Sequence, residues 1–123
     1  MITKEDVLQL HTLSIEHYGG SHGVRDTGMM ESAVNRPYQE FETQPLYPTA
    51  IDQAAAIFES MIANHPFIDG NKRTGLLAMF ALLDMNGIRL SASEENMYQF
   101  TIDVATGKMD VDEIASWLSE NTY

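Results

Sequence analysis

The apolar positions repeat with the period of an α-helix along most of the chain. Between residues 51 and 62, apolar side chains recur every three or four positions, at Ile51, Ala54, Ala55, Phe58, Met61 and Ile62. This spacing puts them on one face of a helix. Pro66 ends that helix, because a proline forces the residue before it out of the α region. A second helix is predicted over about residues 70–87. Its segment 76–83 is apolar on every face, so we expect it to be the buried central helix.

Capping residues predict the remaining helices. Side chains suited to an N-cap precede three periodic segments, at Thr3, Asp26 and Asp110, since such groups accept hydrogen bonds from the first free N–H groups of a helix. We therefore expect helices over about 3–18, 26–34, 93–105 and 110–120. Residues 37–48 show no helical period and are expected to be extended or irregular. The predicted fold is all-α, a compact bundle of about six helices.

The size and composition fit one domain. The chain has 123 residues, of which 44% are hydrophobic, enough for a single core. The longest apolar stretch, residues 75–83, is too short to span a membrane. The first residues lack the basic and apolar regions of a signal peptide. Cysteine is absent, which excludes disulfides and thiolate metal sites and favours a cytoplasmic location. We expect one domain over residues 1–123.

The net charge is strongly negative. Eighteen acidic residues against seven Lys and Arg give −11 at pH 7. Such a charge repels nucleic acids and anionic membranes, because phosphate contacts require basic side chains. A basic protein partner fits this charge, and so does a simple contribution to solubility. The composition leaves both interpretations open.

The most informative stretch is residues 65–75, His-Pro-Phe-Ile-Asp-Gly-Asn-Lys-Arg-Thr-Gly, which joins the two clearest helices. The second helix begins within it, and a helix N-terminus offers unpaired N–H groups and partial positive charge to an anion. Gly70 lets an anion approach the backbone closely. Lys72 and Arg73 add charges that the helix dipole disfavours there. This arrangement is typical of a polyphosphate site.

Two further residues of this stretch suit group transfer. Asp69 could hold a Mg²⁺ ion that bridges phosphates, because this ion takes one or two carboxylates together with phosphate oxygens. His65 is a natural proton acceptor for an attacking hydroxyl, because imidazole is the side chain most often used as a general base. Together they predict a phosphoryl- or nucleotidyl-transfer site. The alternative is an ordinary helix–loop–helix corner, in which these polar side chains only cap helices or face solvent.

The same stretch resembles the signature of the Fic/Doc family, whose adenylylating form reads H-P-F-x-[D/E]-G-N-G-R-x-x-R. Most signature positions match, namely His65, Pro66, Phe67, Asp69, Gly70, Asn71 and Arg73. Lys72 and Leu76 depart from it, and both departures are typical of the Doc (death-on-curing) branch, whose motif continues N-K-R-T. Segments 18–20, 23–26 and 105–107 also resemble Doc proteins. The resemblance therefore covers nearly the whole chain.

The resemblance implies a fold and a role for each site residue. The fold is the Fic/Doc helical bundle, and residues 38–47 correspond to the flap that aligns a target segment by strand-like pairing. His65 is implied as the general base and Asp69 as the Mg²⁺ ligand. The implied ATP-phosphate ligands are Gly70, Asn71, Lys72 and Arg73. A Doc-type protein is the toxin of a toxin–antitoxin pair. It transfers the γ-phosphoryl group of ATP to a Ser or Thr of elongation factor Tu, arrests translation, and is paired with a Phd-like antitoxin.

Two other functions remain open. With Leu76 in place of the last arginine, an anchor for the outer phosphates is lost, so phosphorylation is preferred over protein adenylylation, although Lys72 could restore part of that contact. The chain could also be a catalytically idle module that binds an antitoxin. Self-inhibited Fic proteins carry an [S/T]-x-x-x-E-[G/N] helix. Segments 91–96 and 116–121 both fit this permissive pattern, and a separate antitoxin is the expected regulator.

Overall fold

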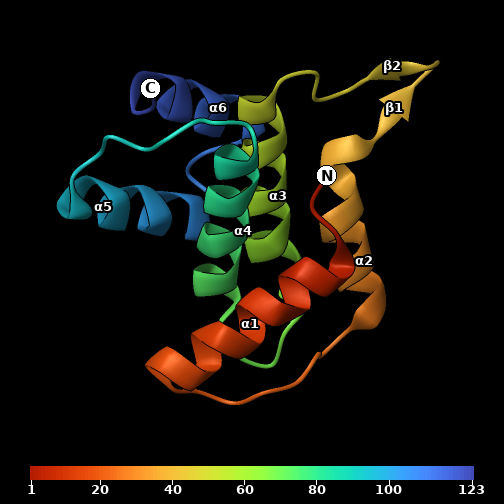
Figure 1. The fold of residues 1–123 in the computed structure, drawn as a ribbon, viewed down its shortest axis with the longest axis vertical. Helices are drawn as coiled ribbons and strands as arrows, with labels where there is room; N and C mark the ends of the chain where they lie inside the picture. The colour runs from red at the N-terminus through yellow and green to blue at the C-terminus, as the bar shows by residue number, and fades with distance from the viewer.

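Six α-helices and one short hairpin make up the fold, which we describe for residues 1–123 from a computed structural model (Figure 1). In chain order the elements are α1 (Lys4–Tyr18), α2 (Thr27–Asn35), the 3₁₀ turn η1 (Arg36–Tyr38), β1 (Glu40–Phe41), β2 (Gln44–Pro45), α3 (Ala50–Asn64), α4 (Asn71–Met85), α5 (Glu94–Ala105) and α6 (Val111–Glu120). The predicted all-α bundle of about six helices is confirmed. No helix is long and apolar enough to cross a membrane.

The predicted N-caps are present. Thr3 and Asp6 exchange side-chain and main-chain hydrogen bonds in a capping box at the start of α1. Asp110 and Glu113 form a second box at α6, and Asp26 accepts a hydrogen bond from the third residue of α2. Each cap satisfies an otherwise unpaired N–H group and contributes about 1 kcal/mol to the free energy of unfolding.

The central helix is α3, so the prediction that α4 is the buried central helix is wrong. Helix α3 packs against α2, η1, α4, α5 and α6, and its residues 54–58 are inaccessible to solvent. Figure 1 shows α3 and α4 side by side, with α1 crossing below them. Helix α4 keeps one face at the surface, where Phe80 is 37% exposed. The buried side chains of α4 lie on the side that packs mainly against α3 and α1.

A hairpin projects from the body in the region that was expected to be extended. Strands β1 and β2 pair antiparallel and stand away from the helices in Figure 1. Glu42 and Thr43 form the turn with positive φ angles of 49° and 67°. Arg36 holds the base of the hairpin, because it donates hydrogen bonds to Tyr47 and to Glu59 of α3. The hairpin is therefore anchored at its base and free at its tip.

Candidate functional site

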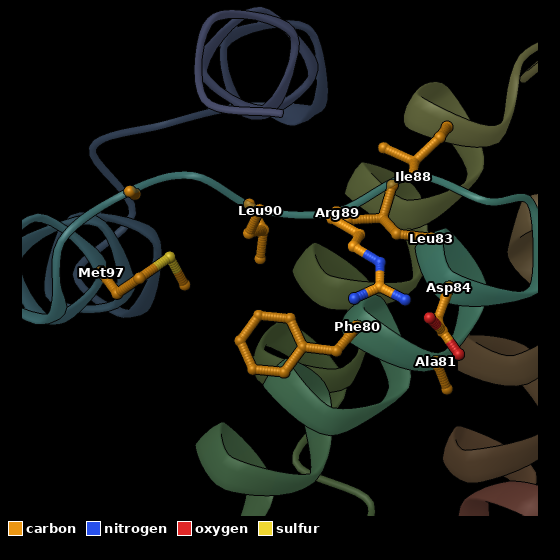
Figure 2. Close-up of a pocket in the computed structure, with 9 residues that line it drawn as sticks. Phe80, Ala81, Leu83, Asp84, Ile88, Arg89, Leu90 and Met97 are labelled. Carbon is orange, nitrogen blue, oxygen red and sulfur yellow. The ribbon is translucent and has the colours of Figure 1, made fainter. Parts of the chain in front are cut away.

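Two pockets lie near opposite ends of α4. The larger, about 590 Å³, is shown in Figure 2 and is mostly apolar, with Phe80, Ile88 and Leu90 among its lining residues. Its only charged side chains are Asp84 and Arg89, which offer no nucleophile or cluster of phosphate ligands. The smaller pocket, about 470 Å³, is polar and lies where α3 ends and α4 begins. It is the candidate functional site on chemical grounds, despite its smaller volume.

Every site residue predicted from the sequence lines the polar pocket. These residues are His65, Asp69, Gly70, Asn71, Lys72 and Arg73, joined by Ile62, Ile68 and Ala105. The loop that carries them is held by main-chain pairing with residues 23–26. Val24 and Phe67 form an antiparallel bridge, and the N–H of Ile68 donates to the carbonyl of Gly23. The loop that follows α1 therefore fixes the segment between α3 and α4.

His65 is the C-cap of α3 and has a left-handed backbone, with φ 48° and ψ 54°. This conformation is uncommon for a residue other than glycine, and such residues concentrate at functional sites. Its Nδ1 lies 2.8 Å from the carbonyl oxygen of Ile62. Because a carbonyl only accepts, Nδ1 carries the proton and Nε2 keeps its lone pair. His65 is therefore held as the tautomer whose Nε2 can accept a proton.

Arg25 fixes the backbone of His65 from the opposite side. Its Nε donates to the carbonyl of His65 at 2.6 Å, and its Nη2 donates to the carbonyl of Asn64 at 2.9 Å. These are carbonyls at the C-terminus of α3, where a cation is favoured by the helix dipole. Arg25 does not line the pocket. Its two hydrogen bonds hold the backbone at the end of α3.

The N-terminus of α4 faces the pocket without a cap. Gly70 occupies the N-cap position with φ 79° and offers no side chain to the first N–H groups. The N–H groups of Asn71, Lys72 and Arg73 have no acceptor in the protein, and the first bonded one is that of Thr74. Three unpaired N–H groups and two cationic side chains form a site for an anion with several charges.

The two cations at this site are arranged differently. Lys72 is exposed and makes no hydrogen bond or ion pair. Arg73 donates from Nη2 to the carbonyl of Gly19 at 3.0 Å, and its guanidinium lies 5.5 Å from the centre of the Tyr18 ring. Arg73 therefore already bridges α4 to the C-terminus of α1, with the rest of its guanidinium donors available. Lys72 is the more adaptable phosphate ligand.

Asp69 is held by main-chain N–H groups. Its Oδ1 accepts from Gly70 at 2.8 Å, and its Oδ2 accepts from Ser21 at 3.2 Å. A side chain at Gly20 would bring a Cβ within 2.5 Å of Oδ2, so this close approach requires glycine. No group of three or more His, Cys, Asp or Glu side chains gathers to hold a metal ion. One carboxylate with free lone pairs fits Mg²⁺ only as a shared ligand, with phosphate oxygens and water supplying the rest.

Asn71 uses its side chain to close the loop. Its Oδ1 accepts from the N–H of Phe67 at 2.9 Å, and its Nδ2 donates to the carbonyl of the same residue at 3.0 Å. Both groups are buried. The group that Asn71 offers to the pocket is therefore its main-chain N–H. Its role as a phosphate ligand remains a prediction, now through the backbone.

His11 was not recognised from the sequence as part of this site. It is 4% exposed, stacks on Phe67 with ring centres 3.8 Å apart, and its Nε2 lies 2.8 Å from the carbonyl oxygen of Asp69. The available signal was a histidine on the apolar face of the first helix, in step with Val7 and Ile15. That signal does not identify partners that lie more than fifty residues away in the chain.

The two candidate self-inhibition segments lie away from the pocket. The N–H of Ser91 donates to the carbonyl of Asn121, so segments 91–96 and 116–121 meet each other beyond the C-terminus of α4. A helix of 15 residues is about 22 Å long, and the polar pocket is at its other end. In this conformation neither segment can block the N-terminus of α4.

Comparisons with known proteins give consistent matches. The model of the Fic/DOC family matches residues 1–83. The chain is 36% identical over 120 residues to "Toxin Doc" of Mycolicibacterium smegmatis, which covers 96% of this chain and 90% of that protein. It is 29% identical over 117 residues to "Protein kinase doc" of Escherichia phage P1, covering 95% and 91%. The similarity extends well beyond residues 65–75, to nearly the whole chain.

Proposed function

Because the chain belongs to the Fic/DOC family, we propose that it is a Doc-type toxin that transfers the γ-phosphoryl group of ATP to a Ser or Thr hydroxyl of a target protein. The observation that carries this proposal is the tautomer of His65, whose Nδ1 is committed to the Ile62 carbonyl. This leaves a proton acceptor in the same pocket as the uncapped N-terminus of α4. Base and anion site are the two requirements of phosphoryl transfer.

In the proposed reaction each group of the pocket has its own role. Nε2 of His65 accepts the proton of the attacking hydroxyl. The new bond forms between that oxygen and the γ-phosphorus, while the bond from the γ-phosphorus to the bridging oxygen breaks and ADP leaves. The N–H groups of residues 71–73 and the side chain of Lys72 stabilise phosphate charge. A Mg²⁺ ion held by Asp69 and the phosphates would neutralise further charge.

The hairpin supports a protein target. Strands β1 and β2 carry unpaired main-chain groups at their outer edges, which suits strand-like pairing with an extended segment. We propose elongation factor Tu as that target, with arrest of translation as the result, and a Phd-like antitoxin as the regulator. The names of the two relatives support the toxin and kinase parts of this proposal.

Intact-protein mass spectrometry of elongation factor Tu tests the reaction. After incubation with this protein, ATP and Mg²⁺, we expect a gain of one phosphate and release of ADP. His65→Ala should lower the rate by about 10²–10⁴-fold, the usual contribution of a general base. His17→Ala is the matched control, because His17 is exposed on α1 and does not line the pocket.

Other products would point to other functions. A gain of AMP with release of pyrophosphate would contradict phosphorylation and favour an adenylyltransferase, the alternative that Leu76 makes less suitable. Unchanged elongation factor Tu, combined with ATP binding and no turnover, would favour an idle module that binds an antitoxin.

A further inference from the structure

His11 is a buried histidine that joins α1 to the loop of the polar pocket. It is 4% exposed and contacts the loop in two ways. Its ring lies parallel to the ring of Phe67, at 6° and with centres 3.8 Å apart. Its Nε2 lies 2.8 Å from the carbonyl oxygen of Asp69. Because that carbonyl can only accept, Nε2 carries a proton and donates it.

These two contacts lie on either side of the loop's centre. The side chain of Asn71 holds the main-chain N–H and carbonyl of Phe67. The carbonyl of Asp69 belongs to the peptide that leads into Gly70, the N-cap of α4. A Cβ placed at Gly70 would come within 3.8 Å of His11 Cδ2, so the helix start rests against this ring. His11 therefore reaches the proposed metal ligand and the proposed phosphate site at the same time.

We propose that His11 is a positioning residue for the Mg²⁺–ATP site, acting through its Nε2–H bond to the Asp69 carbonyl. This inference rests on the proposed function. The bond fixes the peptide between Asp69 and Gly70, and this peptide sets both the direction of the Asp69 carboxylate and the place where the unpaired N–H groups of α4 begin. His11 does not line the pocket, so it acts on the nucleotide only through these residues.

Two substitutions separate the hydrogen bond from the ring. His11→Gln keeps an N–H donor at nearly the position of Nε2 but removes the stacked ring. His11→Phe keeps a ring against Phe67 but removes the donor to the Asp69 carbonyl, a partly buried contact. The matched control is Val7→Ala, which makes a cavity in the buried face of the same helix and removes neither the hydrogen bond nor the stacked ring of His11. It lowers stability without touching the site.

Steady-state kinetics and calorimetry on the full chain give the test. For His11→Phe we expect the KM for Mg²⁺–ATP and its Kd to rise about tenfold, the usual effect of one lost hydrogen bond, with the KM for the protein target unchanged. His11→Gln should restore both values to within about threefold, a typical residual for an imperfect donor. Val7→Ala should lower the melting temperature and leave both values unchanged.

Several results would overturn the inference. Mg²⁺–ATP binding by His11→Phe equal to the native chain would exclude the positioning role. Binding by His11→Gln as weak as that of His11→Phe would show that a donor at this position does not restore the site, which contradicts a role through the hydrogen bond. If the native chain binds Mg²⁺–ATP but modifies no protein, the proposed function fails while the Kd comparison still decides the role of His11. If the native chain does not bind Mg²⁺–ATP at all, both proposals fail.

Discussion

Asn71 pairs with both main-chain polar groups of Phe67, accepting from its N–H and donating to its carbonyl. Residue 71 is the first residue of α4 and residue 67 lies in the loop before it, so this pair closes the loop with two hydrogen bonds. The pair is buried, and a broken buried hydrogen bond leaves a group unsatisfied. It is one of the contacts that hold the loop beside the polar pocket.

Asn71→Asp should therefore destabilise the protein strongly. The new carboxylate keeps the acceptor for the Phe67 N–H but faces the Phe67 carbonyl with an oxygen in place of the Nδ2 donor. We expect the free energy of unfolding to fall by about 2–4 kcal/mol, as for an unpaired buried charge, and Mg²⁺–ATP binding to be lost. Urea denaturation and calorimetry provide the measurement.

Asn86→Asp is the control for that substitution. Asn86 lies next to the C-terminus of the same helix and makes the same type of bond, from Nδ2 to the carbonyl of Leu82 at 2.8 Å, but it is exposed. The loss there should stay below about 1 kcal/mol, the range for an exposed bond near a helix end. Equal losses at the two positions would contradict the importance of the Asn71–Phe67 pair.

The approach of Gly20 to Asp69 gives a second prediction. Both Gly19 and Gly20 have positive φ angles, 83° and 116°, so an alanine at either position strains the backbone by about 1–2 kcal/mol. They differ in their surroundings. A Cβ at Gly19 meets nothing within 4 Å, whereas a Cβ at Gly20 lies 2.5 Å from Asp69 Oδ2.

Only Gly20→Ala should therefore disturb the site. We expect it to displace the Asp69 carboxylate and to lower kcat/KM for Mg²⁺–ATP by about tenfold or more, since a displaced ligand loses transition-state stabilisation. Gly19→Ala should lower the free energy of unfolding by about as much as Gly20→Ala does, and it should leave kcat/KM within about twofold of the native value. Matched activity in the two variants would show that the carboxylate has no role in nucleotide use.

Local signals were enough to predict the helices and the composition of the pocket. Caps at Thr3, Asp26 and Asp110 are properties of a few neighbouring residues, and each is present as predicted. The stretch 65–75 brings base, carboxylate and cations together because they are close in the chain. Caps and clusters whose residues are close in the chain can therefore be predicted from the sequence of that segment alone.

Long-range contacts could not be predicted in this way. His11 contacts Asp69 and Phe67 only because α1 crosses α4, and nothing in residues 1–18 specifies that crossing. The identity of the central helix was missed for a similar reason. Segment 76–83 is uniformly apolar, but apolar content does not tell which face will be covered, and Phe80 remains at the surface.

Arg25 supplies a third prediction, at the C-terminus of α3. Arg25→Ala removes two hydrogen bonds to the carbonyls of Asn64 and His65 and leaves the left-handed backbone of His65 less constrained. We expect the free energy of unfolding to fall by about 1–3 kcal/mol and kcat to fall more than the affinity for ATP. The control is Arg89→Ala, because the Arg89 side chain makes no hydrogen bond or ion pair. An equal fall of kcat in both variants would contradict the role of Arg25.

Thr74 supplies the last prediction, in which a substitution raises the free energy of unfolding. Its side chain is fully buried, and its Oγ1 has no hydrogen-bond partner. Thr74→Val replaces the hydroxyl with a methyl group of similar size and removes the penalty for burying an unpaired polar group, so we expect the free energy of unfolding to rise by about 1 kcal/mol.

Thr101→Val is the matched substitution, because Thr101 Oγ1 donates to the carbonyl of Met97 at 2.8 Å. There the same change should lower the free energy of unfolding by about 0.5–1 kcal/mol, since it removes a hydrogen bond that is made. Thermal and urea unfolding of both variants measure whether the free energy of unfolding rises or falls. A loss of stability in Thr74→Val would mean that its hydroxyl has a partner, such as a buried water, and that α4 is held against its neighbours by a polar contact next to the polar pocket.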